Sequence, residues 1–126
     1  MRHFIAYHNA EERGFSSTSI PRPRVVTRKA VDGLAGVTVW LIAGEGKSPK
    51  SYYLASKFIV EKVSPNAHPG ADLPNEIEGS GNLYKLSIPI VDKLLDKVRK
   101  DSNNFRNGLY EIRDPKLAVE LIAATR

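Results

Sequence analysis

The side chains best suited to chemistry stand at the end of the first apolar stretch, where His8 and Asn9 follow Tyr7. Residues 2–8 alternate in a way that predicts a β-strand open to burial on both faces. A polar group at a strand end beside a cleft is well placed to contact a ligand. A histidine that only caps the strand or faces solvent is the simpler alternative, and the sequence leaves both interpretations open.

A second candidate is the loop over residues 44–48, Gly-Glu-Gly-Lys-Ser, which lies between two apolar runs. Glycines let a backbone approach a ligand closely, and the lysine adds positive charge. A P-loop also needs a glycine five positions before Gly46, where Leu41 stands. It needs a helix directly after the Lys-Ser pair, whereas Pro49 and a predicted strand follow here. We therefore exclude nucleotide hydrolysis by this motif and retain a basic connecting loop.

Aromatic side chains flank this loop, with Trp40 before it and Tyr52 and Tyr53 after it. Aromatic rings interleaved with cations can stack on nucleic-acid bases. Packing in the core is the alternative that we favour for Trp40 and Tyr52, because large rings dominate protein interiors.

Other reactive constellations are missing from the sequence. Without cysteine there is no disulfide, thiolate ligand or thiol nucleophile. His3 and His8 are five apart on a predicted strand and so face opposite ways, which makes a poor metal pair. No nucleophile elbow with a Ser/His/Asp order and no close carboxylate pair is evident. We expect no catalytic residues, no cofactor and no metal site.

Charge is distributed unevenly over the 126 residues, whose formal net charge is +5. Residues 1–57 hold 9 Lys and Arg against 4 Asp and Glu, whereas residues 58–126 hold 10 of each kind. The whole excess therefore lies in the half that contains the basic loop. A basic surface attracts polyanions such as DNA or RNA, and ordinary solvation of a mildly basic protein is the alternative.

Length and composition predict one domain over residues 1–126, with a real core because 41% of the residues are hydrophobic. The longest apolar run, residues 37–43, is too short to span a bilayer. The first residues lack the apolar region of a signal peptide. We expect a cytoplasmic protein without a membrane partner.

Runs of β-branched and aromatic residues predict strands at residues 2–8, 25–26, 38–43, 52–60, 82–86 and 109–112. In the fourth of these, strict alternation would place Tyr52, Leu54, Phe58 and Val60 on one face. Residues 64–81 carry three prolines and three glycines, which predicts a long loop.

Helix signals follow the strands. Asn9 is a plausible cap for a short helical turn. A longer helix is expected to open at Pro89, and Asp114 followed by proline marks the start of the last one. Residues 15–24 are typical of an extended loop, whose Arg22 and Arg24 are spaced so that both could face a phosphate backbone.

The order of these signals resembles the PUA-like superfamily, and within it the EVE-type domains. Such domains open with a strand that runs into a polar corner, as residues 4–9 do here. A pair of strands follows, in which residues 54–60 match the pattern Leu-x-x-x-Phe-x-Val. A helix, a loop and a strand then close the domain, matched here by residues 90–98, 103–108 and 109–112. The Trp-Leu start and Ser-Glu-Pro corner usual in EVE-type domains are replaced here by other residues.

The resemblance implies an α+β fold, a small and partly closed β-barrel of about five to six strands with helices at its ends. It implies a non-catalytic module that binds RNA, or a modified base in DNA, in a pocket between barrel and helix. A base held in this way is flipped out, stacked and read at its edge.

In that setting Tyr7, His8 and Asn9 would read the base edge, and Trp40 or Tyr52 would stack on it. Phosphates would be held by basic side chains, namely Arg22, Arg24, Lys47, Lys50 and Arg106.

Two other classes of function remain open. His8, Asn9, Glu11 and Glu12 could serve a small-molecule pocket or a catalytic barrel of the same fold. Alternatively, the chain is an interaction module of a toxin–antitoxin, phage-defence or restriction system, with a nuclease or another defence-system protein as partner.

Overall fold

The computed structural model describes residues 2–28, 31–47, 49–65, 75–105 and 108–125. Its strands are β1 (His3–Asn9), β2 (Arg24–Thr27), β3 (Thr38–Glu45), β4 (Ser51–Pro65), β5 (Asn75–Leu83) and β6 (Leu109–Glu111). Its helical segments are α1 (Ala10–Arg13), the 3₁₀ turn η1 (Ser17–Ser19), α2 (Asp92–Asp101) and α3 (Pro115–Ala124).

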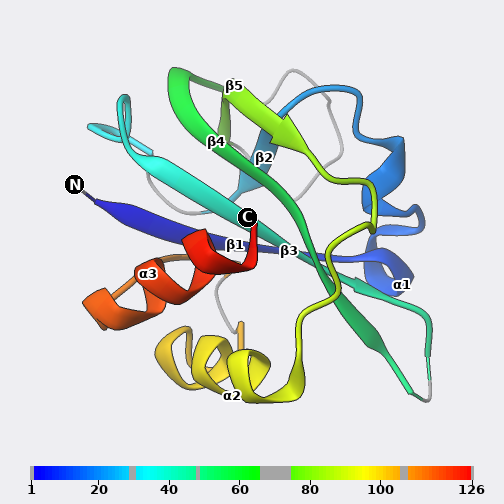
Figure 1. Cartoon of the computed structure of the whole chain (residues 1–126). Helices are drawn as coiled ribbons and strands as arrows, with labels where there is room; N and C mark the ends of the chain where they lie inside the picture. The colour runs from blue at the N-terminus through cyan, green and yellow to red at the C-terminus, as the bar shows by residue number, and fades with distance from the viewer. Residues whose placement is uncertain (1, 29–30, 48, 66–74, 106–107, 126) are drawn as a thin grey trace.

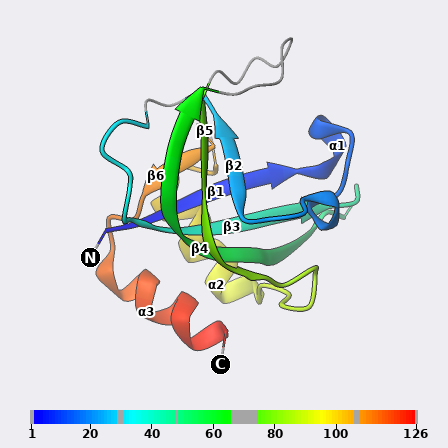
Figure 2. The same ribbon diagram turned by 90° about the horizontal axis from the view of Figure 1, so that it is seen from above.

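The six strands form one mixed sheet in the order β2-β5-β4-β3-β1-β6. β1 runs parallel to β3, and every other pair is antiparallel. The sheet curls so that β4, β5 and β2 rise away from the plane of β1 and β3 (Figure 2). The edge strands β2 and β6 are not paired with each other, so the curl stops at a half-barrel. The prediction of a small, partly open α+β barrel is confirmed at this level.

The two faces of the sheet bury separate cores. Phe4 and Ala6 of β1 share one cluster with Val25 of β2 and Ile77 of β5, strands that lie at the far side of the curled sheet. We call this the inner face. Ile5, between them, belongs to the other cluster, which is closed by α2 and α3 and which we call the helix face (Figure 1). The alternation of β1 and its burial on both faces are as the sequence predicts.

The helices start where local chemistry allows. α3 begins as predicted, because the Asp114 carboxylate caps it by accepting a hydrogen bond from the Lys116 amide at 3.0 Å. α2 begins later than expected, at Asp92 rather than at Pro89. Pro89 instead forms an isolated bridge with Tyr53, and Val91 is still extended. The amide of Glu11 donates to the Asn9 carboxamide oxygen at 3.1 Å, which supports Asn9 as the cap of α1.

The predicted loop over residues 64–81 is wrong in part, because β4 continues to Pro65 and β5 already begins at Asn75. Residues 66–74 of that prediction lie outside the described residues. Gly79 and Gly81 are strand residues at a close backbone approach. A β-carbon on Gly81 would stand 2.6 Å from the Phe58 α-carbon, and one on Gly79 would stand 2.7 Å from the Ile59 carbonyl carbon. The glycines therefore mark tight strand pairing rather than turns.

The predicted single face for β4 is also wrong. The pairing of β3 with β4 shifts by one residue, from Leu41 opposite Ser56 to Ile42 opposite Leu54. Such a β-bulge reverses the side to which the following side chains point. Leu54 accordingly packs on the helix face, whereas Phe58 packs on the inner face.

Candidate functional site

A cavity of about 330 Å³ opens on the inner face, beside the end of β1. Its walls come from β1, α1, the segment 15–21 that follows α1, and β2, with Leu41 contributed by β3. We call it the inner cavity. Its size falls at the lower end of the range of small-ligand pockets, about 300–1,000 Å³.

His8 is a buried member of this wall. Its Nε2 lies 2.8 Å from the carbonyl oxygen of Phe15, which can only accept, so Nε2 carries the proton. Burial lowers the pKa of His8, and the charge of Arg13 lowers it further, against the opposing effects of the Phe15 carbonyl and Glu45. The ring is therefore neutral at pH 7. Its Nδ1 is left as an acceptor, for which the described part of the chain offers no hydrogen-bond partner.

Phe15 and Arg13 extend the same wall. The rings of His8 and Phe15 are tilted against each other with centroids 4.8 Å apart. The guanidinium of Arg13 lies 5.5 Å from the centroid of Phe15, a cation–π contact. Partial burial lowers the pKa of Arg13, and the positive charge of Arg24 lowers it further. The two guanidinium groups therefore repel each other across the cavity.

Arg24 enters the cavity from β2. Its Nη2 pairs with the Glu76 carboxylate of β5 at 3.1 Å, and both side chains are largely buried. Its Nε is also buried, and no hydrogen-bond partner for it exists among the described residues. A buried donor without an acceptor is costly, so this atom lowers the stability of the free protein.

Glu45, at the end of β3, fixes the outer wall. Its carboxylate accepts hydrogen bonds from the Ser16 hydroxyl and from the amide and hydroxyl of Ser17. These contacts tie the segment that follows α1 to the sheet, across 29 positions of sequence. Sequence reasoning missed this role because no local signal links a carboxylate in a glycine-rich loop with a distant serine pair.

Tyr7 lines the inner cavity but also belongs to the core of the helix face. Its ring stacks on Phe105 with centroids 4.3 Å apart, and Tyr52 lies beside both rings at 6.2 and 6.1 Å. Gly44 permits this arrangement, because a β-carbon there would clash with the Tyr7 hydroxyl and stand 2.9 Å from Cδ of Lys50. This close approach, rather than a phosphate loop, accounts for the glycine at position 44.

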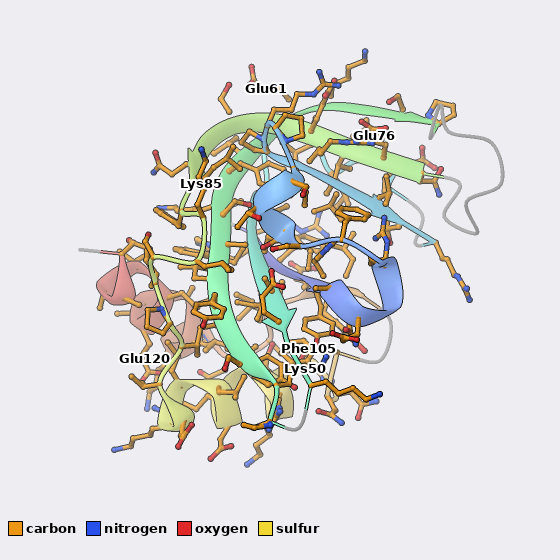
Figure 3. All side chains as sticks on the ribbon, turned by 90° about the vertical axis from the view of Figure 1, so that its right-hand side faces the viewer. Lys50, Glu61, Glu76, Lys85, Phe105 and Glu120 are labelled. Atoms are coloured by element: carbon orange, nitrogen blue, oxygen red, sulfur yellow. The ribbon has the colours of Figure 1, made fainter. Side chains whose placement is uncertain are left out.

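Asn9 joins the corner to the basic loop. Its carboxamide oxygen accepts a hydrogen bond from Nζ of Lys50 at 3.0 Å as well as the one from the amide of Glu11. Figure 3 shows Lys50 and Phe105 at the same end of the molecule. The predicted corner Tyr7-His8-Asn9 is thus tied to that loop, with His8 on the inner face and the Tyr7 ring on the helix face.

Trp40 stands apart from the inner cavity. It is completely buried on the helix face, and its Nε1 donates to Nδ1 of His3 at 3.0 Å. Lys57 lies 4.9 Å from the centroid of its ring. A ring without exposed surface offers no face on which a base can stack, so Trp40 acts as a wall of the fold.

Of the basic residues predicted to hold phosphates, those that the structure describes are spread over different strands and loops. Arg22 pairs with Glu78 at 2.9 Å in an exposed ion pair, and Arg24 pairs with Glu76. Lys47 is exposed in the loop between β3 and β4, close in sequence to Lys50. Arg106 lies outside the described residues.

Neither a metal centre nor a membrane span emerges from the described residues. No group of three or more His, Asp or Glu side chains there could hold a metal ion. No helix in the same residues is long and apolar enough to cross a membrane. Glu11, considered for a catalytic barrel, is exposed and contributes its backbone amide to the cap of α1.

Comparisons of this chain with family models, with curated proteins and with solved structures find no match.

Proposed function

We propose that this protein is a non-catalytic nucleic-acid-binding module that takes one unpaired or flipped-out base into the inner cavity. The observation that carries the proposal is the composition of that cavity. A tilted His8–Phe15 aromatic pair, apolar side chains and two arginines line one space of about 330 Å³. Aromatic and apolar walls suit the faces of a base, and cations suit the phosphates beside it.

One atom in the cavity wall suits the edge of a base. Nδ1 of His8, a residue that lines the cavity, is a hydrogen-bond acceptor without a protein partner among the described residues. Nucleobases carry donor groups on their edges that match such an acceptor. Arg24 also lines the cavity, and its guanidinium is a source of N–H donors.

Charge supports a ligand that carries phosphate. Arg13 has no carboxylate partner within the described residues, and its pKa is lowered by burial and by Arg24. An anion between the two guanidinium groups would relieve their repulsion. The segment 1–57, which supplies both arginines, also carries all of the excess positive charge.

Titration of labelled single-stranded RNA and DNA, followed by fluorescence anisotropy at low salt, tests the proposal. We expect binding that weakens steeply with salt. Arg13→Gln should weaken binding by about tenfold, as expected for loss of one charge-assisted hydrogen bond. Lys116→Gln is the matched control, because it removes the same charge from α3 on the helix face.

Oligonucleotides with one modified base extend the titration, since the PUA-like resemblance implies a reader of modified bases. Tighter binding of one modification, with the preference lost in Phe15→Ala, would support base capture in the inner cavity. Absence of binding to every oligonucleotide at low salt would refute the proposal. Equal weakening by Arg13→Gln and Lys116→Gln would show that binding is only nonspecific electrostatic attraction.

A small-molecule pocket is the second candidate function, and the size of the inner cavity beside buried His8 favours it. A ligand that binds only the native state raises the melting temperature. Stabilisation by free nucleosides, with no binding of oligonucleotides, would favour this function over the first.

A further inference from the structure

We propose that a second cavity, on the helix-face side of the β3–β4 hairpin, binds a backbone phosphate of the same nucleic-acid strand. This inference rests on the proposed function and adds a second contact to it. The second cavity measures about 410 Å³ and lies between the start of β4 and the segment that comprises residues 89–90 and α2. Lys50, Ser51, Tyr52, Tyr53 and Arg99 line it with polar groups.

Lys50 brings a positive charge that no carboxylate neutralises within the described residues. Its Nζ donates to the carboxamide oxygen of Asn9 at 3.0 Å and to the carbonyl oxygen of Gly46 at 3.3 Å. Both acceptors are neutral. An ammonium group has three donor hydrogens, so one remains for a ligand.

Arg99 brings the second charge, from α2. Its guanidinium lies 4.7 Å from the centroid of the Tyr52 ring, and the described residues supply no ion-pair partner for it. This cation–π contact orients the guanidinium without neutralising it. Two partly buried cations, Lys50 and Arg99, therefore face one cavity.

The same contacts decide which part of a nucleotide fits. Arg99 occupies one face of the Tyr52 ring, and Tyr7 and Phe105 pack beside that ring. The ring is thereby unavailable to stack on a base. Ser51, Tyr52 and Tyr53 also line the cavity. Two cations without a free aromatic face suit a phosphate rather than a base.

Asp92 is the one carboxylate in the lining, and its position has a separate explanation. It is the first residue of α2, where a negative charge interacts favourably with the helix dipole. It forms no ion pair with Lys50 or Arg99 among the described contacts. The charged groups of the cavity therefore sum to a net positive charge.

Two contacts connect the second cavity with the inner cavity. Lys50 of the second cavity bonds to Asn9, the neighbour of His8, and Tyr52 stacks beside Tyr7, which lines the inner cavity. In Figure 1 the β3–β4 hairpin extends between α1 and α2, the helical elements that contribute to the two cavities. A strand with one base in the inner cavity could therefore pass around this hairpin, with Lys47 beside its path, and place a phosphate against Lys50 and Arg99.

Binding of an oligonucleotide as a function of salt tests this placement. Arg99→Gln should weaken binding by about tenfold and reduce the slope of log affinity against log salt by about 1. Lys100→Gln is the matched control, since Lys100 is the next residue of α2 and does not line the cavity. It should change both quantities much less.

Arg99→Lys keeps the charge and should keep the salt slope, which separates a phosphate contact from loss of packing on Tyr52. If Arg99→Gln and Lys100→Gln behave alike while Arg13→Gln still weakens binding, the second cavity is not a phosphate site and the proposed function survives. If the wild-type protein binds no oligonucleotide, both proposals fall. Binding of an acidic peptide that is lost in Arg99→Gln, with oligonucleotide binding unchanged, would assign the cavity to a protein partner and overturn this inference.

Discussion

The helix face and the inner face of the same sheet are covered in different ways. On the helix face, α2 and α3 cover Ile5, Trp40 and Leu54 completely. On the inner face the sheet covers itself by curling, and the curl stops short of closure. Near the end of β1 this leaves a cavity that contains an imidazole and two guanidinium groups.

The difference shows where the main core and the proposed base-binding site lie in this fold. Strands packed under helices bury apolar side chains fully, and every large ring there is needed to fill space. A half-barrel that closes imperfectly keeps polar groups partly desolvated without satisfying all of them, as at Nδ1 of His8. Such groups stabilise the free protein poorly but are prepared to bind a ligand.

The largest effect should come from Trp40→Ala on the helix face. Removal of a fully buried Trp ring leaves a cavity and an unpaired Nδ1 on His3, and should lower the free energy of unfolding by about 3–5 kcal/mol. Urea denaturation measures this loss. Affinity per folded molecule should be unchanged, and a marked loss of affinity would contradict the separation of the two faces.

The next largest effect on stability should come from Glu45→Ala, which removes the hydrogen bonds that attach the outer wall of the inner cavity to the sheet. Loss of hydrogen bonds from Ser16 and Ser17 to a carboxylate should cost about 1–3 kcal/mol of unfolding free energy. Oligonucleotide affinity should fall as well, because the wall carries Phe15. Glu61→Ala is the matched control, since Glu61 also accepts from a serine hydroxyl, that of Ser80, but at an exposed site. Equal effects of the two variants would contradict a positioning role for Glu45.

A smaller effect is expected from Asp114→Ala, which removes the cap of α3. Loss of an N-cap side chain costs about 1 kcal/mol, because the amide of Lys116 loses its acceptor. Thermal denaturation measures the change, with Asp96→Ala on the exposed side of α2 as the control. Oligonucleotide affinity should stay constant, because no residue of α3 lines either cavity.

The smallest effect should be a pH dependence that originates in His8 and His3. Burial lowers the pKa of both rings below the unfolded value of about 6.5. As the pH falls through about 6.5, the folded protein therefore binds fewer protons than the unfolded chain. The contribution of the two rings to the free energy of unfolding is full above about pH 6.5 and falls as the pH drops below it. Melting temperatures between pH 7.5 and 5.5 measure the change.

His8→Gln should remove the part of this dependence that arises on the inner face, and the remainder belongs to His3. The contribution of the Arg2–Glu111 ion pair to stability can be told apart from that of the two histidines. It is lost only in more acidic solution, because the pKa of Glu111 is lowered in the folded protein. An unchanged pH dependence in His8→Gln would show that the ring is not neutralised by burial.

Local rules predicted the elements that depend on neighbours within a few residues. The alternation of β1, the Asn9 cap and the start of α3 at Asp114 all follow from side-chain chemistry at fixed short spacings. The same rules failed where a distant strand decides. Gly79 and Gly81 suggest turns in isolation, and only the backbone of β4 shows why a strand needs them.

The residues of the candidate site fall into the same two groups, those with a local signal in the sequence and those that depend on distant parts of the chain. The polar corner Tyr7-His8-Asn9 and the basic loop were visible in the sequence, since a strand end and glycines mark both. The roles of Arg13, Phe15 and Glu45 were not, because they depend on a segment folding back over the sheet. Arg99 has no local signal in the sequence that marks it as part of a site, and its place beside Tyr52 follows from how α2 packs on β4.

The sequence by itself determined that both sides of β1 are buried, that the basic half carries the loop, and that this loop is no P-loop. Tertiary structure alone decided on which face each polar group lies. The physical reasons are the bulge in β4, which reverses side-chain directions, and the pairing of β2 with β5, which brings together Arg24 and Glu76. Periodicity along one strand contains no information about either.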